Sequence, residues 1–99
     1  EETYQKIQGG GLASAKAYNN LGILYIKQNQ YEKAQDAFNS SIKFYPQIPD
    51  AYYNFGKLIL DSNGNRKVAQ KYLTLALRHN KSPSLKEKIN LLLEKALSP

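Results

Sequence analysis

The chain alternates between stretches with helical spacing and short polar breaks. Apolar and small side chains recur every three or four positions, which is the period of an amphipathic α-helix. The first stretch carries Ala17, Tyr18, Leu21, Leu24 and Tyr25. The second carries Ala34, Ala37, Phe38, Ser41, Ile42 and Tyr45. No stretch shows the period-two alternation of a β-strand, so the pattern predicts an all-α protein.

The breaks mark where each predicted helix ends. Asn29-Gln30 separates the first two stretches, and Pro46 and Pro49 close the second and open a third. The third stretch carries Tyr52, Phe55 and Ile59 and ends at Asn63-Gly64-Asn65. The fourth carries Ala69, Tyr72, Leu73, Ala76 and Leu77. Short breaks between helices of similar length predict antiparallel helix pairs.

The first pair returns in the second with a period of 34 residues. The pairs at this spacing are Tyr18 and Tyr52, Asn20 and Asn54, Gly22 and Gly56, Leu24 and Leu58, and Phe38 and Tyr72. Glycine in the middle of a helix costs about 1 kcal/mol relative to alanine. A close approach between paired helices would explain Gly22 and Gly56, with Ala34 and Ala69 as the facing small side chains.

The final segment, residues 82–99, predicts one amphipathic helix. Ser84 and Glu87 have the spacing of a capping box at its start. Its apolar face consists of Leu85, Ile89, Leu92, Leu93 and Ala96. Such a helix can cover the last hairpin, as terminal units of helical-repeat proteins do.

Residues 15–48 resemble the tetratricopeptide repeat. The matching positions are Tyr18, Leu21, Gly22, Tyr25, Tyr31, Ala34, Phe38 and Pro46, with Ser41 in place of the usual alanine. The second unit matches if one residue is inserted near Asp61 to Gly64. The resemblance implies a right-handed α-solenoid of antiparallel helix hairpins with a C-terminal capping helix. It also implies that Tyr18, Tyr25, Tyr31 and Tyr52 are core residues.

Four segments follow from this interpretation. Residues 1–11 are expected to be the remnant of a preceding repeat helix, with Gly9-Gly10-Gly11 as a flexible joint. Residues 12–48 and 49–83 are the two predicted repeats, and residues 84–99 are the predicted capping helix.

The composition of the chain excludes several kinds of catalytic and metal-binding site. The chain has 99 residues and no cysteine, so it can form neither disulfides nor thiolate metal sites. Its single histidine, His79, lies beside Arg78 near a predicted helix end, and no acidic pair has the spacing of a catalytic or metal site. The glycine run at residues 9–11 lacks the lysine of a phosphate-binding loop. The sequence therefore predicts no enzyme, no metal and no cofactor.

The resemblance also implies a place for a partner. Family members usually bind on a concave face that is lined by the first helix of each hairpin. Transferred to this chain, that face is Lys16, Asn19, Ile23, Ile26, Lys27, Asp50, Tyr53, Lys57, Leu60 and Asp61. Its apolar members, rimmed by lysines, suit a peptide or an amphipathic helix of a partner. The alternative is that a neighbouring segment of the chain, such as the N-terminal stretch, covers them. The predicted function is a protein-binding adaptor or assembly module.

Charge leaves two alternatives open. The net charge of +6 resides in residues 62–99, which carry eight basic residues against Glu87 and Glu94. A basic surface of this kind could bind nucleic acid or an anionic membrane, although no exposed aromatic residue is expected among its cations. The second alternative is self-association through residues 1–11 or through Leu91 and Leu97. No apolar run reaches the length of a membrane span, and both the cytoplasm and the bacterial cell envelope fit the composition.

Overall fold

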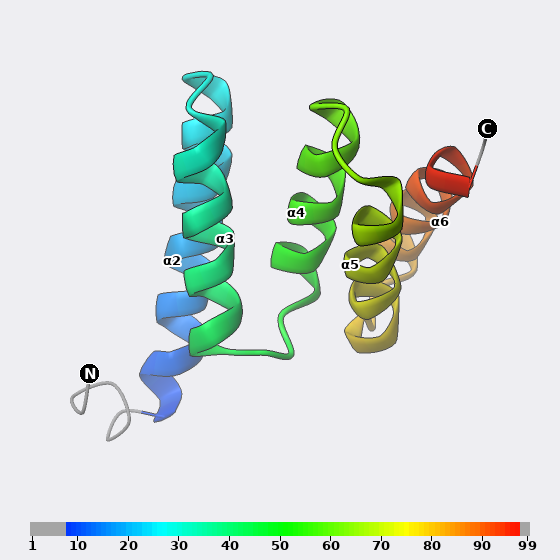
Figure 1. The fold of residues 1–99 in the computed structure, drawn as a ribbon. Helices are drawn as coiled ribbons and strands as arrows, with labels where there is room; N and C mark the ends of the chain where they lie inside the picture. The colour runs from blue at the N-terminus through cyan, green and yellow to red at the C-terminus, as the bar shows by residue number, and fades with distance from the viewer. Residues whose placement is uncertain (1–7, 98–99) are drawn as a thin grey trace. The chain divides into compact units, whose positions relative to one another are not determined.

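The structure is a computed structural model that describes residues 8–97, and this part of the chain is all-α (Figure 1). Its helices are α2 (Gln8–Lys27), α3 (Tyr31–Phe44), α4 (Pro49–Asp61), α5 (Arg66–His79) and α6 (Pro83–Leu97). The predicted fold class is confirmed. The predicted repeat remnant at residues 1–11 lies almost wholly outside the described residues.

The chain divides into two compact units between Ile48 and Pro49. The first unit contains the antiparallel pair α2 and α3, called hairpin 1 from here on. The second contains the antiparallel pair α4 and α5, called hairpin 2, with α6 packed against α5.

Helix α2 begins earlier than the sequence predicted. The expected flexible joint at Gly9-Gly10-Gly11 is wrong, because these glycines belong to the helix. A Cβ atom at Gly11 would lie 3.1 Å from the carbonyl oxygen of Phe44, so α2 and the end of α3 approach closely here. Packing against α3 stabilises this turn of the helix despite the low helix propensity of glycine.

Each hairpin is aligned by one large apolar side chain seated on a glycine. In hairpin 1 the fully buried ring of Phe38 occupies the place of a Cβ at Gly22. In hairpin 2 a Cβ at Gly56 would lie 2.7 Å from Cγ of Leu73. The glycines therefore permit the predicted close approach. The nearest side chains are Phe38 and Leu73, and the backbone carbonyl of the expected Ala69 also lies 3.3 Å from a Cβ at Gly56.

Ser41 extends the contact between the helices of hairpin 1. This side chain is fully buried on α3, and its hydroxyl donates a hydrogen bond of 2.6 Å to the backbone carbonyl of Ala15 on α2. A buried hydroxyl without a partner would destabilise the fold, so this bond explains how serine replaces the usual alanine. In hairpin 2 the equivalent residue is Ala76, which is also fully buried.

Both first helices end in the same way. Asn29 follows α2 with a positive φ of 61°, and Asn63 follows α4 with a φ of 59°. The next amide in each turn donates to a carbonyl five residues earlier, from Gln30 to Tyr25 at 2.9 Å and from Gly64 to Ile59 at 2.7 Å. This is the Schellman ending, in which asparagine adopts the left-handed conformation.

The predicted insertion is confirmed, and the structure places it at Asn65. Gln30 precedes α3 without a side-chain cap, whereas hairpin 2 adds Asn65 after its turn. The Asn65 side chain accepts hydrogen bonds from the amides of Lys67 at 2.8 Å and Val68 at 3.3 Å, so the extra residue caps α5. Residues of α5 are therefore equivalent to residues of α3 at a spacing of 35. Leu73, not Tyr72, is the equivalent of Phe38.

Helix α6 packs against α5 through the predicted apolar face. Ile89 and Ala96 are buried, and the side-chain amide of Gln70 on α5 donates a hydrogen bond of 3.1 Å to the carbonyl of Ala96. The predicted cap at Ser84 is wrong. Pro83 is the first helical residue, and Ser82 accepts a long hydrogen bond of 3.4 Å from the amide of Leu85.

Candidate functional site

On hairpin 1, most of the predicted partner-binding residues reach the surface of α2. Lys16 and Lys27 are exposed, and Ile23 and Ile26 are partly exposed between them. The prediction for Asn19 is wrong. This residue is buried, with 6% of its surface exposed, and does not project outward. Helical spacing alone could not show that Asn19 is buried. The remaining four residues are called the α2 strip.

On hairpin 2, the predicted residues of α4 form a second strip. Asp50 and Lys57 are exposed, while Tyr53 and Leu60 are partly exposed. The ammonium of Lys57 lies 3.0 Å from a carboxylate oxygen of Asp61, one helical turn away. Both side chains are about half exposed, so this pair adds little stability and leaves the lysine available to a partner. The name α4 strip is used from here on for Asp50, Tyr53, Lys57, Leu60 and Asp61.

The tyrosines divide into core and surface residues. Tyr52 is buried, and burial together with the nearby Tyr72 raises the pKa of its phenol above the usual value. Tyr18 stacks on Phe44 with ring centroids 5.4 Å apart. Tyr31 was expected in the core but is 44% exposed, and its hydroxyl donates a 3.0 Å hydrogen bond to the side chain of Asn29. Its place at the start of α3 turns the ring toward the preceding turn.

Helix α5 presents the basic surface that the sequence predicted. It contains no acidic residue, and its outer face borders a cleft of about 470 Å³. The residues that line this cleft are Lys67, Gln70, Lys71, Thr74, Leu75 and Arg78. The cations follow one stripe of the helix because they are spaced by four and seven residues.

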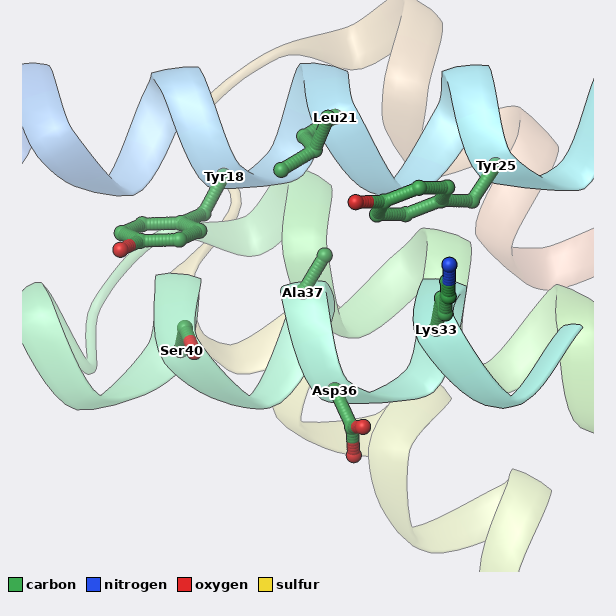
Figure 2. Close-up of a pocket in the computed structure, with 7 residues that line it drawn as sticks. All are labelled: Tyr18, Leu21, Tyr25, Lys33, Asp36, Ala37 and Ser40. Atoms are coloured by element: carbon green, nitrogen blue, oxygen red, sulfur yellow. The ribbon is translucent and has the colours of Figure 1, made fainter. Parts of the chain in front are cut away.

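Another cleft, of about 290 Å³, lies on hairpin 1 and was not anticipated from the sequence. Figure 2 shows the rings of Tyr18 and Tyr25 at its two ends, with Leu21 and Ala37 facing each other across the space between them. Lys33 points toward Tyr25, with its ammonium 5.9 Å from the ring centroid. Asp36 and Ser40 complete the lining. The sequence feature that indicates this cleft is Ala37. At a spacing of 35 its equivalent is Tyr72, so hairpin 1 has a small side chain where hairpin 2 has a large ring.

The two outermost leucines of α6 are exposed as expected. Leu91 is 66% and Leu97 is 69% exposed. Self-association through these side chains stays a prediction. Among residues 8–97, no group of three or more potential metal-binding side chains comes together, and no helix is long and apolar enough to cross a bilayer.

Comparison with known families agrees with this geometry. Two consecutive matches to the tetratricopeptide repeat cover residues 15–48 and 49–82. The chain therefore belongs to the tetratricopeptide-repeat family. Repeats of this family generally mediate protein–protein interactions, and the proteins that contain them are typically scaffolds without enzymatic activity.

A similarity to one characterised protein covers part of the chain. The chain is 38% identical over 50 residues to the transcription activator GutR of Bacillus subtilis (strain 168). The matched segment is 48% of this chain and 6% of that protein. The similarity thus concerns a small part of a much longer protein.

Proposed function

We propose that the chain is an adaptor or assembly module that binds a partner peptide or helix along the α2 and α4 strips. The observation that carries the proposal is the partial exposure of Ile23, Ile26, Tyr53 and Leu60 beside exposed lysines. Neither hairpin uses these side chains to align its own two helices, since Phe38 and Leu73 do so. Apolar side chains bordered by charges are typical of surfaces that bind amphipathic segments.

A substitution in each strip tests this surface. The partner is first captured by a photo-reactive residue at Ile26 and identified, and its affinity is then measured by titration calorimetry. We expect Ile23→Glu and Tyr53→Ala each to raise the dissociation constant by about tenfold, because each removes an apolar contact from the centre of a strip.

The matched control is Asn39→Glu, a new carboxylate at an exposed position on α3 outside both strips. It should leave the affinity unchanged. The proposal fails if Ile23→Glu and Tyr53→Ala also bind normally while their circular dichroism spectra match that of the wild type.

A second candidate function is polyanion binding through α5. The absence of any acid from this helix, together with the stripe of Lys67, Lys71 and Arg78, favours it. The aromatic Tyr72 is not part of the stripe, because it stacks on Phe55 with centroids 4.5 Å apart. The candidate therefore depends on charge alone.

Salt dependence measures this candidate directly. If three cations contact phosphates, the logarithm of the affinity for duplex DNA should fall with the logarithm of salt concentration with a slope of about −2.7. The double substitution Lys67→Glu and Lys71→Glu should abolish binding, as followed by fluorescence anisotropy. Absence of binding at about 50 mM salt would remove the candidate.

A further inference from the structure

The cleft of hairpin 1 lies on the side of α2 opposite the α2 strip. Tyr18, Leu21 and Tyr25 border the cleft, whereas Ile23 and Ile26 belong to the strip. Since consecutive helical residues are about 100° apart around the axis, the two sets face in nearly opposite directions. A ligand of the cleft would thus bind independently of the proposed function.

Hairpin 2 shows what fills the same place when the chain supplies it. The equivalents of Tyr18, Leu21 and Ala37 are Tyr52, Phe55 and Tyr72. The Tyr72 ring stacks on Phe55 with centroids 4.5 Å apart and on Tyr52 at 6.2 Å. A tyrosine ring at this position thus bridges the two aromatic residues contributed by the first helix.

Hairpin 1 has the residues that would surround such a ring, but it has alanine where hairpin 2 has the tyrosine. Ala37 ends at its Cβ, and the space beyond it remains bounded by Tyr18, Leu21 and Tyr25 (Figure 2). Aromatic side chains favour stacked or edge-to-face neighbours at centroid distances of about 4.5–7 Å. The two tyrosines of the cleft can offer this arrangement to a ring that enters from outside.

The charged residues at the edge of the cleft indicate the charge that its ligand should carry. The exposed ammonium of Lys33 points into the cleft beside Tyr25, while the Asp36 carboxylate is directed away from it (Figure 2). Hairpin 1 itself carries four lysines against two acids, Glu32 and Asp36. A carboxylate next to the entering ring would pair with Lys33, and the small excess of lysines on hairpin 1 favours an acidic segment.

We infer that the cleft of hairpin 1 binds one aromatic side chain of an acidic protein segment, with its ring between Tyr18 and Tyr25 and a neighbouring carboxylate at Lys33. The ring enters beside Ala37, where Tyr72 of hairpin 2 stacks on the equivalents of Tyr18 and Leu21, and Tyr25 supplies the second aromatic wall that Leu21 does not. The cleft is a second contact point, separate from the α2 and α4 strips.

The probe for this site is 3-(4-hydroxyphenyl)propionate, which joins a phenol ring to a carboxylate. In a titration followed by NMR, we expect saturable shifts at the Ala37 methyl and at Leu21, with a dissociation constant on the order of 1 mM for so small a ligand. Tyramine, with the same ring and an ammonium group, should bind about fivefold more weakly because of Lys33.

The decisive variant is Ala37→Tyr, which places in hairpin 1 the residue that hairpin 2 already accommodates at Tyr72. It should fold normally and weaken probe binding at least about tenfold, because its own ring fills the cleft. Ile23→Glu, in the α2 strip, should bind the probe as the wild type does. Lys33→Gln should bind both probes with similar affinity.

Three results would overturn the inference. The first is the absence of saturable shifts at Ala37 and Leu21, and the second is their persistence in folded Ala37→Tyr. The third is a concentration-dependent dimer, seen by light scattering, that Ala37→Tyr converts to monomer. In that case a second copy of the chain, not an acidic partner, would be the occupant of the cleft.

Discussion

Phe38→Ala is expected to lower the free energy of unfolding by about 3–5 kcal/mol, the range for removing a fully buried ring. The ring is completely inaccessible and fills the space above Gly22, so its loss leaves a cavity between α2 and α3. Native domains are stable by only about 5–15 kcal/mol, so the variant should lose most of its stability. Urea denaturation followed by circular dichroism at helical wavelengths measures the change.

Phe38→Leu keeps the measurement possible if the alanine variant does not fold. It removes fewer buried carbons and should cost about 1–2 kcal/mol. The control, Asn39→Ala, changes the exposed neighbour on the same helix and should stay within about 0.5 kcal/mol of the wild type. A loss below about 1 kcal/mol in Phe38→Ala would contradict the assigned role of this ring in aligning the hairpin.

Gly22→Ala is expected to destabilise the protein by about 2 kcal/mol, although alanine is the better helix former. The added methyl would enter the space of the fully buried Phe38 ring, so the ring would have to shift within a packed interior. The gain in helix propensity, about 1 kcal/mol, offsets only part of this overpacking. Thermal and urea unfolding of the purified variant measure the net effect.

A double-mutant cycle separates the clash from other causes. In the Phe38→Ala or Phe38→Leu background, the methyl of Gly22→Ala finds more room, so its cost should shrink or reverse. An equal cost with and without the full ring would mean that the methyl is unfavourable for a reason unrelated to Phe38.

The helices and their pairing could be predicted because they depend on local patterns. Apolar spacing, the asparagine turns and the prolines gave the helix order, and the 34-residue period gave the family. The starts of helices were harder to predict. Gly11 lies in a helix close to the Phe44 carbonyl, and Ser82 caps α6 in place of Ser84. Such contacts depend on tertiary structure, which spacing alone does not encode.

The candidate site was only partly predictable for the same reason. Helical spacing placed Ile23 and Tyr53 on exposed faces, but it could not show that Asn19 is buried or that Tyr31 is exposed. The cleft of hairpin 1 depends on the absence of a side chain at Ala37. That absence becomes meaningful only when the offset of 35 between α3 and α5 shows Tyr72 at the same place.

The extra residue at Asn65 has a consequence for how such repeats can diverge. Hairpin 2 keeps its helices in register despite a longer connection, because Leu73 on Gly56 fixes the alignment and Asn65 simply starts α5. Connection length and helix alignment are therefore separate properties. A hairpin of this kind can therefore take an extra residue between its helices while its interior stays the same, as long as the glycine still faces its bulky neighbour.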